Sequence, residues 1–390
     1  MGSKKGTGAP KGSENAERDA PLVSVVLLAY NHLEYTKLCT ESLIRHTHDV
    51  DYELITVDNG SSDGTKEYFE SLPNRKKLSF PENVGVDCAV NAGFRLARGK
   101  YVLNLSNDIV VTARWLSNLV ACMESDERVA MAVPVCGFSS NGQQVELSYG
   151  TLDEMQEKAE AFNRSNPDLW EDRLKLVTYT CLFRRDAFEL IGGFDEAFNP
   201  GAYDDDAVGF LLRRRGYRLI LAKDTYVHHF GSVTFNEEYR KNNIAVRNRD
   251  LFFRKFGVDS WGASTPDSNV VKLADCAKKG EVSILGVGQS CGASLLQIKN
   301  GFRKNGNREV KLSYLTEAAR SLPDLATVCE FCTFGIPGDV KRYFSGRLYD
   351  LIIVESETGS IGDRKSFYAD LASLCLLYTS PSPRDQRGSR

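Results

Sequence analysis

Between residues 23 and 105 the chain alternates apolar stretches of strand length with amphipathic stretches of helical length. The strand candidates are 23–29, 52–57, 78–80 and 101–105. The helix candidates between them are 35–46, 64–72 and 86–98. Repeated strand–helix units of this length predict an α/β fold with a parallel sheet wound by right-handed crossovers.

The pattern continues less regularly after residue 105. Residues 143–175 are more polar, and we expect a lid or an acceptor-side loop there. Strand character returns at 176–183 and 217–222, with a helix predicted over 207–215 between them.

A cluster of Gly, Ser, Pro and Asp at residues 262–267 marks a predicted domain boundary. Beyond it, strands are predicted at 282–285, 310–315 and 349–354, with a glycine loop and a helix over 293–305 after the first. This order predicts the start of a second, Rossmann-like α/β domain. The predicted parts are a disordered tail (1–20), a first domain (21–261), a truncated second domain (268–376) and a non-native tail (377–390).

Composition excludes several classes of protein. With 42% hydrophobic and 26% charged residues the 390-residue chain has the composition of globular domains, and its net charge of −3 argues against bulk nucleic-acid binding. The sequence has no apolar signal segment at its start and no run long enough for a membrane span. Ten cysteines without framework spacing favour reduced thiols in the cytoplasm.

Small polar and acidic residues follow the first two predicted strands. Asp58 and Asn59 end the second strand and precede two glycines, while Ala29, Tyr30 and Asn31 end the first. A carboxylate and amides at adjacent strand ends can contact the base and ribose of a nucleotide. The alternative is structural, with an Asx turn and with Asp63 capping the next helix.

Amides also flank the third predicted helix. Asn83 and Gly85 precede it, and Asn91 lies within it beside another glycine. These amides could contact a nucleotide or secure a loop, and the residues themselves leave both interpretations open.

The strand 101–105 ends at Ser106, Asn107 and Asp108, and a later strand ends at His228 and His229. A carboxylate so placed could coordinate Mn²⁺ or Mg²⁺ and bridge it to a diphosphate, and a histidine could supply a second ligand. A solvated turn and a structural histidine are the alternatives.

Three carboxylates, Asp204, Asp205 and Asp206, stand just before the predicted helix 207–215. The helix dipole explains part of this cluster. A carboxylate among like charges in a cleft also gains a raised pKa, and it could then accept a proton from an acceptor hydroxyl.

The order of these motifs resembles the GT-A-fold, inverting, family-two glycosyltransferases that build bacterial surface polysaccharides. The resemblance covers about residues 21–256. It implies donor contacts from one group of residues: Ala29, Tyr30, Asn31, Asp58, Asn59, Asn83, Gly85, Asn91 and Asn107. It also implies that Asp205 is the base, with Asp204 in place of the usual Glu, and that Asp108 and His229 are metal ligands. Ser106 departs from the family's metal-binding DxD motif.

The second predicted domain resembles the start of S-adenosylmethionine-dependent methyltransferases. Gly286, Gly288 and Gly292 stand in place of the cofactor loop, and Glu317 stands in place of the ribose-binding acid. Residues 289–290 form an insertion in that loop, and the truncation argues against methyl transfer.

The sequence therefore predicts a metal-dependent hexosyl- or deoxyhexosyltransferase of cell-envelope polysaccharide biosynthesis. It would transfer sugar from a nucleotide-diphosphate donor to a glycan or lipid-linked acceptor, in the cytoplasm or peripherally at the inner membrane. Two alternatives remain: a non-catalytic nucleotide-sugar binding module, suggested by Ser106, and a bifunctional glycosyltransferase/methyltransferase.

Overall fold

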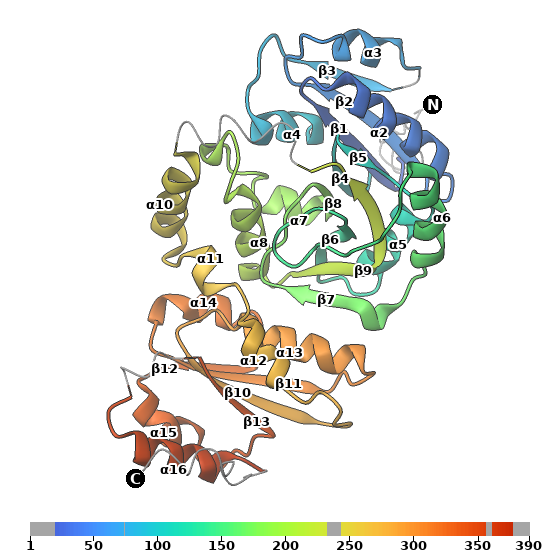
Figure 1. The fold of residues 1–390 in the computed structure, drawn as a ribbon. Coiled ribbons are helices and arrows are strands. Elements are labelled where there is room, and N and C mark those ends of the chain that lie inside the picture. Colours follow the sequence, from blue (N-terminus) through green and yellow to red (C-terminus); the bar gives the residue numbers. More distant parts are fainter. Residues whose placement is uncertain (1–19, 74, 232–242, 356–360, 377–390) are drawn as a thin grey trace, which may run out of the picture.

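The computed structural model describes residues 20–73, 75–231, 243–355 and 361–376. Within these ranges the chain forms two sheets, one of nine strands and one of four (Figure 1). Both tails predicted from the sequence lie outside the described residues, except for Ala20. None of the helices described is long and apolar enough to cross a membrane.

The first sheet begins with four parallel strands in the order β3-β2-β1-β4. Their bounds are Val23–Ala29 for β1, Tyr52–Asp58 for β2, Lys76–Ser79 for β3 and Tyr101–Ser106 for β4. The connecting helices are α2 (Leu33–His46), α3 (Thr65–Ser71) and α4 (Val86–Phe94). All seven predicted elements are confirmed to within a few residues, because their apolar periodicity is strong.

The parallel sheet predicted from the repeated strand–helix units is found in β1 to β4, and antiparallel pairs follow beyond β4. Strand β8 pairs antiparallel with both β4 and β6, while β9 runs parallel to β6 and antiparallel to β5 and β7. The bounds are Ile109–Val110 (β5), Val129–Cys136 (β6), Trp170–Arg173 (β7), Thr180–Arg184 (β8) and Arg218–His229 (β9). Four of the five residues of β8 are buried, so its apolar run resembles that of a parallel strand and does not reveal its direction.

Helix α4 lies directly against the parallel strands. A Cβ added at Gly93 would come within 2.5 Å of Val26 Cγ1 and 2.9 Å of Val57 Cγ2. The glycine therefore permits the close approach that places the N-terminus of α4 beside the carboxyl ends of β1 and β2.

The predicted loop 143–175 is only partly irregular, so that expectation needs correction. It contains α6 (Leu152–Phe162), a short 3-10 helix (Pro167–Leu169) and β7. Thr151 caps α6, since its hydroxyl accepts a hydrogen bond from Glu154 N at 3.2 Å. Most residues of α6 are polar, so the apolar periodicity of this helix is weak in the sequence.

Further helices complete the first part of the chain. Their bounds are Trp115–Glu124 (α5), Arg185–Leu190 (α7), Asp204–Arg214 (α8), Ile244–Phe256 (α10) and Ser260–Ala263 (α11).

The second sheet is parallel, with the order β12-β11-β10-β13. This order places the first strand between the second and the fourth, as in Rossmann-like folds. Its strands are β10 (Val282–Gly288), β11 (Val310–Thr316), β12 (Phe331–Phe334) and β13 (Leu351–Val354). Its helices are α12 (Ser268–Leu273), α13 (Ala293–Lys304), α14 (Leu322–Leu325), α15 (Val340–Phe344) and α16 (Arg364–Leu374).

A buried ion cluster joins α8 to the second sheet's layer of helices. Asp324 in α14 is fully buried and accepts hydrogen bonds from Arg213 at 3.1 Å and from Arg214 at 2.6 Å. Figure 1 shows α8 and α14 next to each other at this joint. The helix that carries the acidic triplet is thus anchored at its opposite end by the second part of the chain.

Candidate functional site

The turns that follow β1 and β2 are bonded to each other at the carboxyl edge of the sheet. Asn31 N donates to Ser61 Oγ at 2.8 Å, and Asn31 Oδ1 accepts from Ser62 N at 2.9 Å. Asn31 has a left-handed backbone with φ of 56°, which asparagine tolerates better than most residues. Ala29 pairs with Asp58 in the β-ladder, so the predicted donor residues of both strands are brought together.

Asp58 is buried beneath this edge. Its carboxylate accepts from Ser61 N at 3.1 Å and from Ser79 Oγ at 2.9 Å. Asp63 caps two helices, because it accepts from Leu33 N at 2.8 Å and from Thr65 N at 3.1 Å. Asp63 therefore has the structural role. The hydrogen bonds from Ser61 and Ser79 fix the orientation of the Asp58 carboxylate.

The predicted donor amides are engaged with one another. Asn59 Nδ2 donates to Asn83 Oδ1 at 3.0 Å, and Asn59 Oδ1 accepts from Val84 N at 3.0 Å. Gly85 N also donates to Asn83 Oδ1, at 2.9 Å. These bonds hold the loop before α4 against the turn after β2, so the structure favours the loop-securing role for the side chains of Asn59 and Asn83.

Asn91 and Asn107 also have internal partners. Asn91 Nδ2 donates to Phe194 O at 2.8 Å, and its Oδ1 accepts from Phe194 N at 2.9 Å. Asn107 Nδ2 donates to Asn31 O at 3.0 Å and to Thr36 Oγ1 at 2.9 Å. Asn91 therefore clamps the loop before α8, and Asn107 braces the turn after β1.

Asp108 and His229 meet across the short β5–β9 pairing. Asp108 Oδ2 lies 3.2 Å from His229 Nε2, and His229 Nδ1 lies 2.8 Å from the carbonyl oxygen of Phe138. Burial lowers the pKa of His229, but the hydrogen bonds and charges of Asp108 and Cys136 together outweigh it and raise that pKa to about 10. Without a metal ion, the imidazolium is therefore paired with the carboxylate.

These two groups fit a divalent cation as two of its ligands. Oxygen and nitrogen ligands about 2 Å from one octahedral ion lie roughly 3 Å apart, close to the separation of Asp108 and His229. Among the described residues no group of three or more His, Cys, Asp or Glu side chains is arranged to hold a metal. A diphosphate and water would have to complete the coordination.

His228 differs from its neighbour. Its Nδ1 lies 2.5 Å from the hydroxyl oxygen of Tyr149, and its ring packs edge-on against Phe230. Burial lowers the pKa of His228. Its role in the described structure is therefore packing and hydrogen bonding.

The acidic triplet diverges at the start of α8. Asp206 accepts from Ser260 Oγ at 2.6 Å and lies 3.8 Å from Lys175 Nζ. Asp205 accepts a hydrogen bond from the Thr178 hydroxyl and is partly exposed. Asp204 is buried and turns toward Asp87 in the first turn of α4.

Thr178 and Tyr179 connect the acidic helix to the Asp108–His229 pair. The Tyr179 ring stacks on His229, with 5.2 Å between ring centroids. Thr178, the preceding residue, bonds Asp205. Burial and then the Asp204 carboxyl raise the pKa of Asp205 well above its ordinary value. Two residues adjacent in sequence thus contact Asp205 on the one hand and His229 on the other.

The sequence analysis missed Thr178 and Asp87. Thr178 has no local signal, since it lies just before a strand and acts across the fold. The sequence does carry a local signal for Asp87, because this residue shares helical spacing with the buried residues Val90, Asn91 and Phe94. An acid on the buried face of a helix needs a partner.

The glycine loop of the second sheet is filled by its own side chains. A Cβ at Gly288 would lie 2.8 Å from Tyr314 Oη, and Ser290 Oγ donates to Glu355 Oε2 at 2.7 Å. A Cβ at Gly286 would lie 2.5 Å from the Tyr314 ring, and Gly292 is the N-cap of α13 with φ of 84°. Glu317 N donates to Gly288 O at 3.2 Å. Cofactor binding by this loop stays a prediction.

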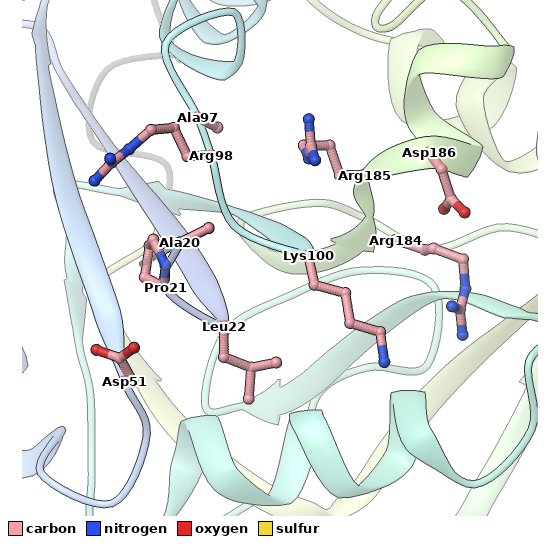
Figure 2. Close-up of a pocket in the computed structure, with 10 residues that line it drawn as sticks. All are labelled: Ala20, Pro21, Leu22, Asp51, Ala97, Arg98, Lys100, Arg184, Arg185 and Asp186. Atoms are coloured by element: carbon pink, nitrogen blue, oxygen red, sulfur yellow. The ribbon is translucent and has the colours of Figure 1, made fainter. Parts of the chain in front are cut away.

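A cavity of about 730 Å³ lies at the opposite edge of the first sheet. Figure 2 shows residues that line it. Leu22 and Lys100 line it just before β1 and β4 begin. Its cations are already engaged: Lys100 pairs with Glu124 at 2.6 Å, and Arg185 donates to Gly99 O at 2.7 Å. Since ligands of open α/β sheets bind at the carboxyl ends of strands, this cavity is not the candidate site.

Comparisons with known proteins place part of the chain beside a family of sugar transferases. Residues 24–192 match the family model described as "Glycosyl transferase family 2". The chain is 24% identical over 268 residues to validoxylamine A glucosyltransferase from Streptomyces hygroscopicus subsp. jinggangensis, covering 62% of each chain. It is 28% identical over 257 residues to glycosyltransferase AglE from Haloferax volcanii, covering 62% of this chain and 80% of AglE.

A solved mannosyltransferase from Pyrobaculum calidifontis, in complex with GDP-Man and Mn²⁺, is also similar. It is 20% identical, with a TM-score of 0.43, and the match covers 61% of this chain and 65% of that one. The chain spans 27% to 62% of the length of three curated relatives that it matches. The match over residues 24–192 is to the same family that the motif order resembles.

Proposed function

We propose that this chain is an inverting glycosyltransferase that uses a nucleotide-diphosphate sugar. One observation carries the proposal: Thr178 and Tyr179, adjacent in sequence, join the carboxyl of Asp205 to the Asp108–His229 pair. These contacts support a site in which Asp205 is the base and Asp108 and His229 bind the cation. The family match over residues 24–192 supports transfer of a sugar as the reaction.

In the proposed step Asp205 accepts the proton of an acceptor hydroxyl. The acceptor oxygen forms a bond to the anomeric carbon as the bond from that carbon to the diphosphate oxygen breaks, with inversion. The electron pair of the broken bond leaves with the diphosphate. The raised pKa of Asp205 suits this role, because a stronger base takes the proton more readily.

Asp108 and His229 would hold Mn²⁺ or Mg²⁺. When bound, such an ion supplies positive charge to the departing diphosphate. In this proposal the donor contacts the sheet edge formed by Asn31 and Asp58. The hydrogen bond between Asn59 and Asn83 positions that edge. Names of relatives include a glucosyltransferase, which supports the hexosyl class. A glycan or lipid-linked acceptor, and a peripheral place at the inner membrane, belong to the same proposal.

The test combines a donor panel with three variants. Purified protein is incubated with UDP-, dTDP- and GDP-sugars and Mn²⁺, with thermal shift reporting donor binding and sugar transfer measured alongside. We expect D205N to lower turnover about 10³-fold while keeping the donor's thermal shift, since only the base is lost. We expect D108N to lose the metal-dependent part of that shift. D168N, which changes a half-buried acid in another part of the structure, is the matched control.

The rival is a non-catalytic nucleotide-sugar binding module, favoured by Ser106 at the first position of the metal-binding motif. It predicts a donor-dependent thermal shift with no transfer and no hydrolysis for the unaltered protein. Equal turnover in D205N and the unaltered protein would contradict the assignment of the base. A bifunctional enzyme would in addition require a thermal shift with S-adenosylmethionine.

A further inference from the structure

A buried carboxyl outside the predicted site stands behind the acidic triplet. Asp87, in the first turn of α4, is fully buried, and within the described structure neither of its side-chain oxygens has a hydrogen-bond partner. Asp204, only 6% exposed, lies against it at the start of α8. A fully buried carboxylate without a donor is costly, so this arrangement needs an explanation.

The loop that leads into α8 holds the start of α4, which carries Asp87. Asn199, in the loop before α8, accepts from Asp87 N at 3.0 Å and donates to Val84 O at 3.3 Å. Its side chain also fills the space beside Gly85, where an added Cβ would lie 2.5 Å from it. The start of α4 and the loop that leads into α8 are thus bonded to each other, and these bonds hold the backbone of Asp87.

Two carboxylates in contact and out of water cannot both be ionised. One shared proton removes the conflict, because the protonated carboxyl then donates to the other and supplies the missing hydrogen bond. We propose that Asp87 and Asp204 share one proton and act together as a positioning pair for Asp205. The role at Asp205 rests on the proposed function; the shared proton does not.

The pair keeps one negative charge close to Asp205. A like charge disfavours ionisation of its neighbour, so the pair strengthens Asp205 as a base. It also occupies Asp204 with Asp87, which leaves Asp205 as the carboxyl that an acceptor hydroxyl can reach. Other charged or titratable groups facing this cluster are Cys88, Cys181, Asp195, Glu196 and Asp206.

The pH dependence of stability reports the shared proton without any assay of transfer. Burial and then the charge of Asp205 raise the pKa of Asp87 from 3.8 to about 8. A raised pKa in the folded state contributes stability that is full below the ordinary value and is lost as the pH rises through about 8. The unfolding free energy of the full chain should therefore fall between pH 5 and pH 8 partly through this pair.

The experiment measures unfolding from pH 5 to pH 9 for the unaltered protein, D87N and D204N. In either variant the amide donates the hydrogen bond permanently and no proton is shared, so the curve should be flatter than that of the unaltered protein. D267N, which alters the acid that caps α12, should run parallel to the unaltered protein. Parallel curves for D87N and D204N would overturn the shared proton.

Turnover measured against pH tests the effect on Asp205. D87N keeps a charge of −1 on the pair, so the acid limb of the profile should stay in place, while D87N/D204N removes that charge and should move the limb down by about one pH unit. A merely structural role would lower turnover without moving the limb, and an unmoved limb in the double variant would overturn the positioning role. Absence of transfer by the unaltered protein would refute the proposed function, yet the unfolding curves would still decide the shared proton.

Discussion

The donor side and the acidic side of the candidate site differ in whether their polar groups have hydrogen-bond partners. On the donor side, Asn31, Asp58, Asn59 and Asn83 satisfy one another and nearby backbone groups. On the acidic side, carboxyl groups gather, and neither side-chain oxygen of Asp87 accepts a hydrogen bond from the described protein groups. The first arrangement fixes a shape, whereas the second holds charged groups in a state that favours proton transfer.

This difference separates residues that stabilise the fold from residues that set proton affinity. Breaking a satisfied network should destabilise the fold, because groups are left buried and unpaired. Relieving the acidic cluster should change proton affinity with little cost in folding, since repulsion is removed. The following variants test this division.

The largest expected effect comes from the anchor of α8. D324A would leave Arg213, only 3% exposed, without its carboxylate partner, and a buried charge stripped of its partner costs about 3 to 5 kcal/mol. Chemical unfolding of the full chain measures this loss. We also expect lower turnover, because α8 carries the acidic triplet at its other end.

The matched control is D168A, which breaks the exposed ion pair between Asp168 and Arg308 that also links the two parts of the chain. It should cost no more than about 1 kcal/mol. Similar losses for D324A and D168A would contradict the view that the buried cluster anchors the acidic side.

A middle effect is expected on the donor side. N59A removes the acceptor of Val84 N and one of the two donors to Asn83 Oδ1, which keeps Gly85 N. Leaving the Val84 N–H unsatisfied costs about 1 to 3 kcal/mol. The donor-dependent thermal shift should shrink as well, because the loop before α4 loosens. N305A, which removes one exposed hydrogen bond to Cys276 O, serves as the control. A stable N59A with an unchanged donor shift would show that the amide bonds do not shape the donor side.

The sequence predicted the parallel strands well and the antiparallel ones poorly, for a physical reason. Strands β1, β2 and β4 lie in a repeated local pattern, whereas the partners of β8 and β9 are chosen by long-range packing. Sequence periodicity reports burial and not direction.

The site shows the same limit. The order of motifs brought Asp108, His229 and Asp205 forward as candidates, and the fold places the first two in contact. No local pattern could reveal that Asn91 bonds Phe194, or that Thr178 bonds Asp205, since these contacts join elements distant in the chain. Asp87 was visible as an acid on an apolar helix face, but its partner was not.

The smallest effect is expected from S79A. Ser79 is exposed and donates to Asp58 Oδ2 at 2.9 Å, while Asp58 keeps its second bond, from Ser61 N. Loss of one hydrogen bond at an exposed donor should cost about 0.5 to 1 kcal/mol, because water can replace it. Unfolding and the donor-dependent thermal shift are measured together, with S71A, which loses an exposed bond to Tyr68 O, as the control. If S79A instead abolished the donor shift while stability held, the orientation of Asp58 would itself control donor binding, and the donor side would depend on one carboxylate more than on its network of amides.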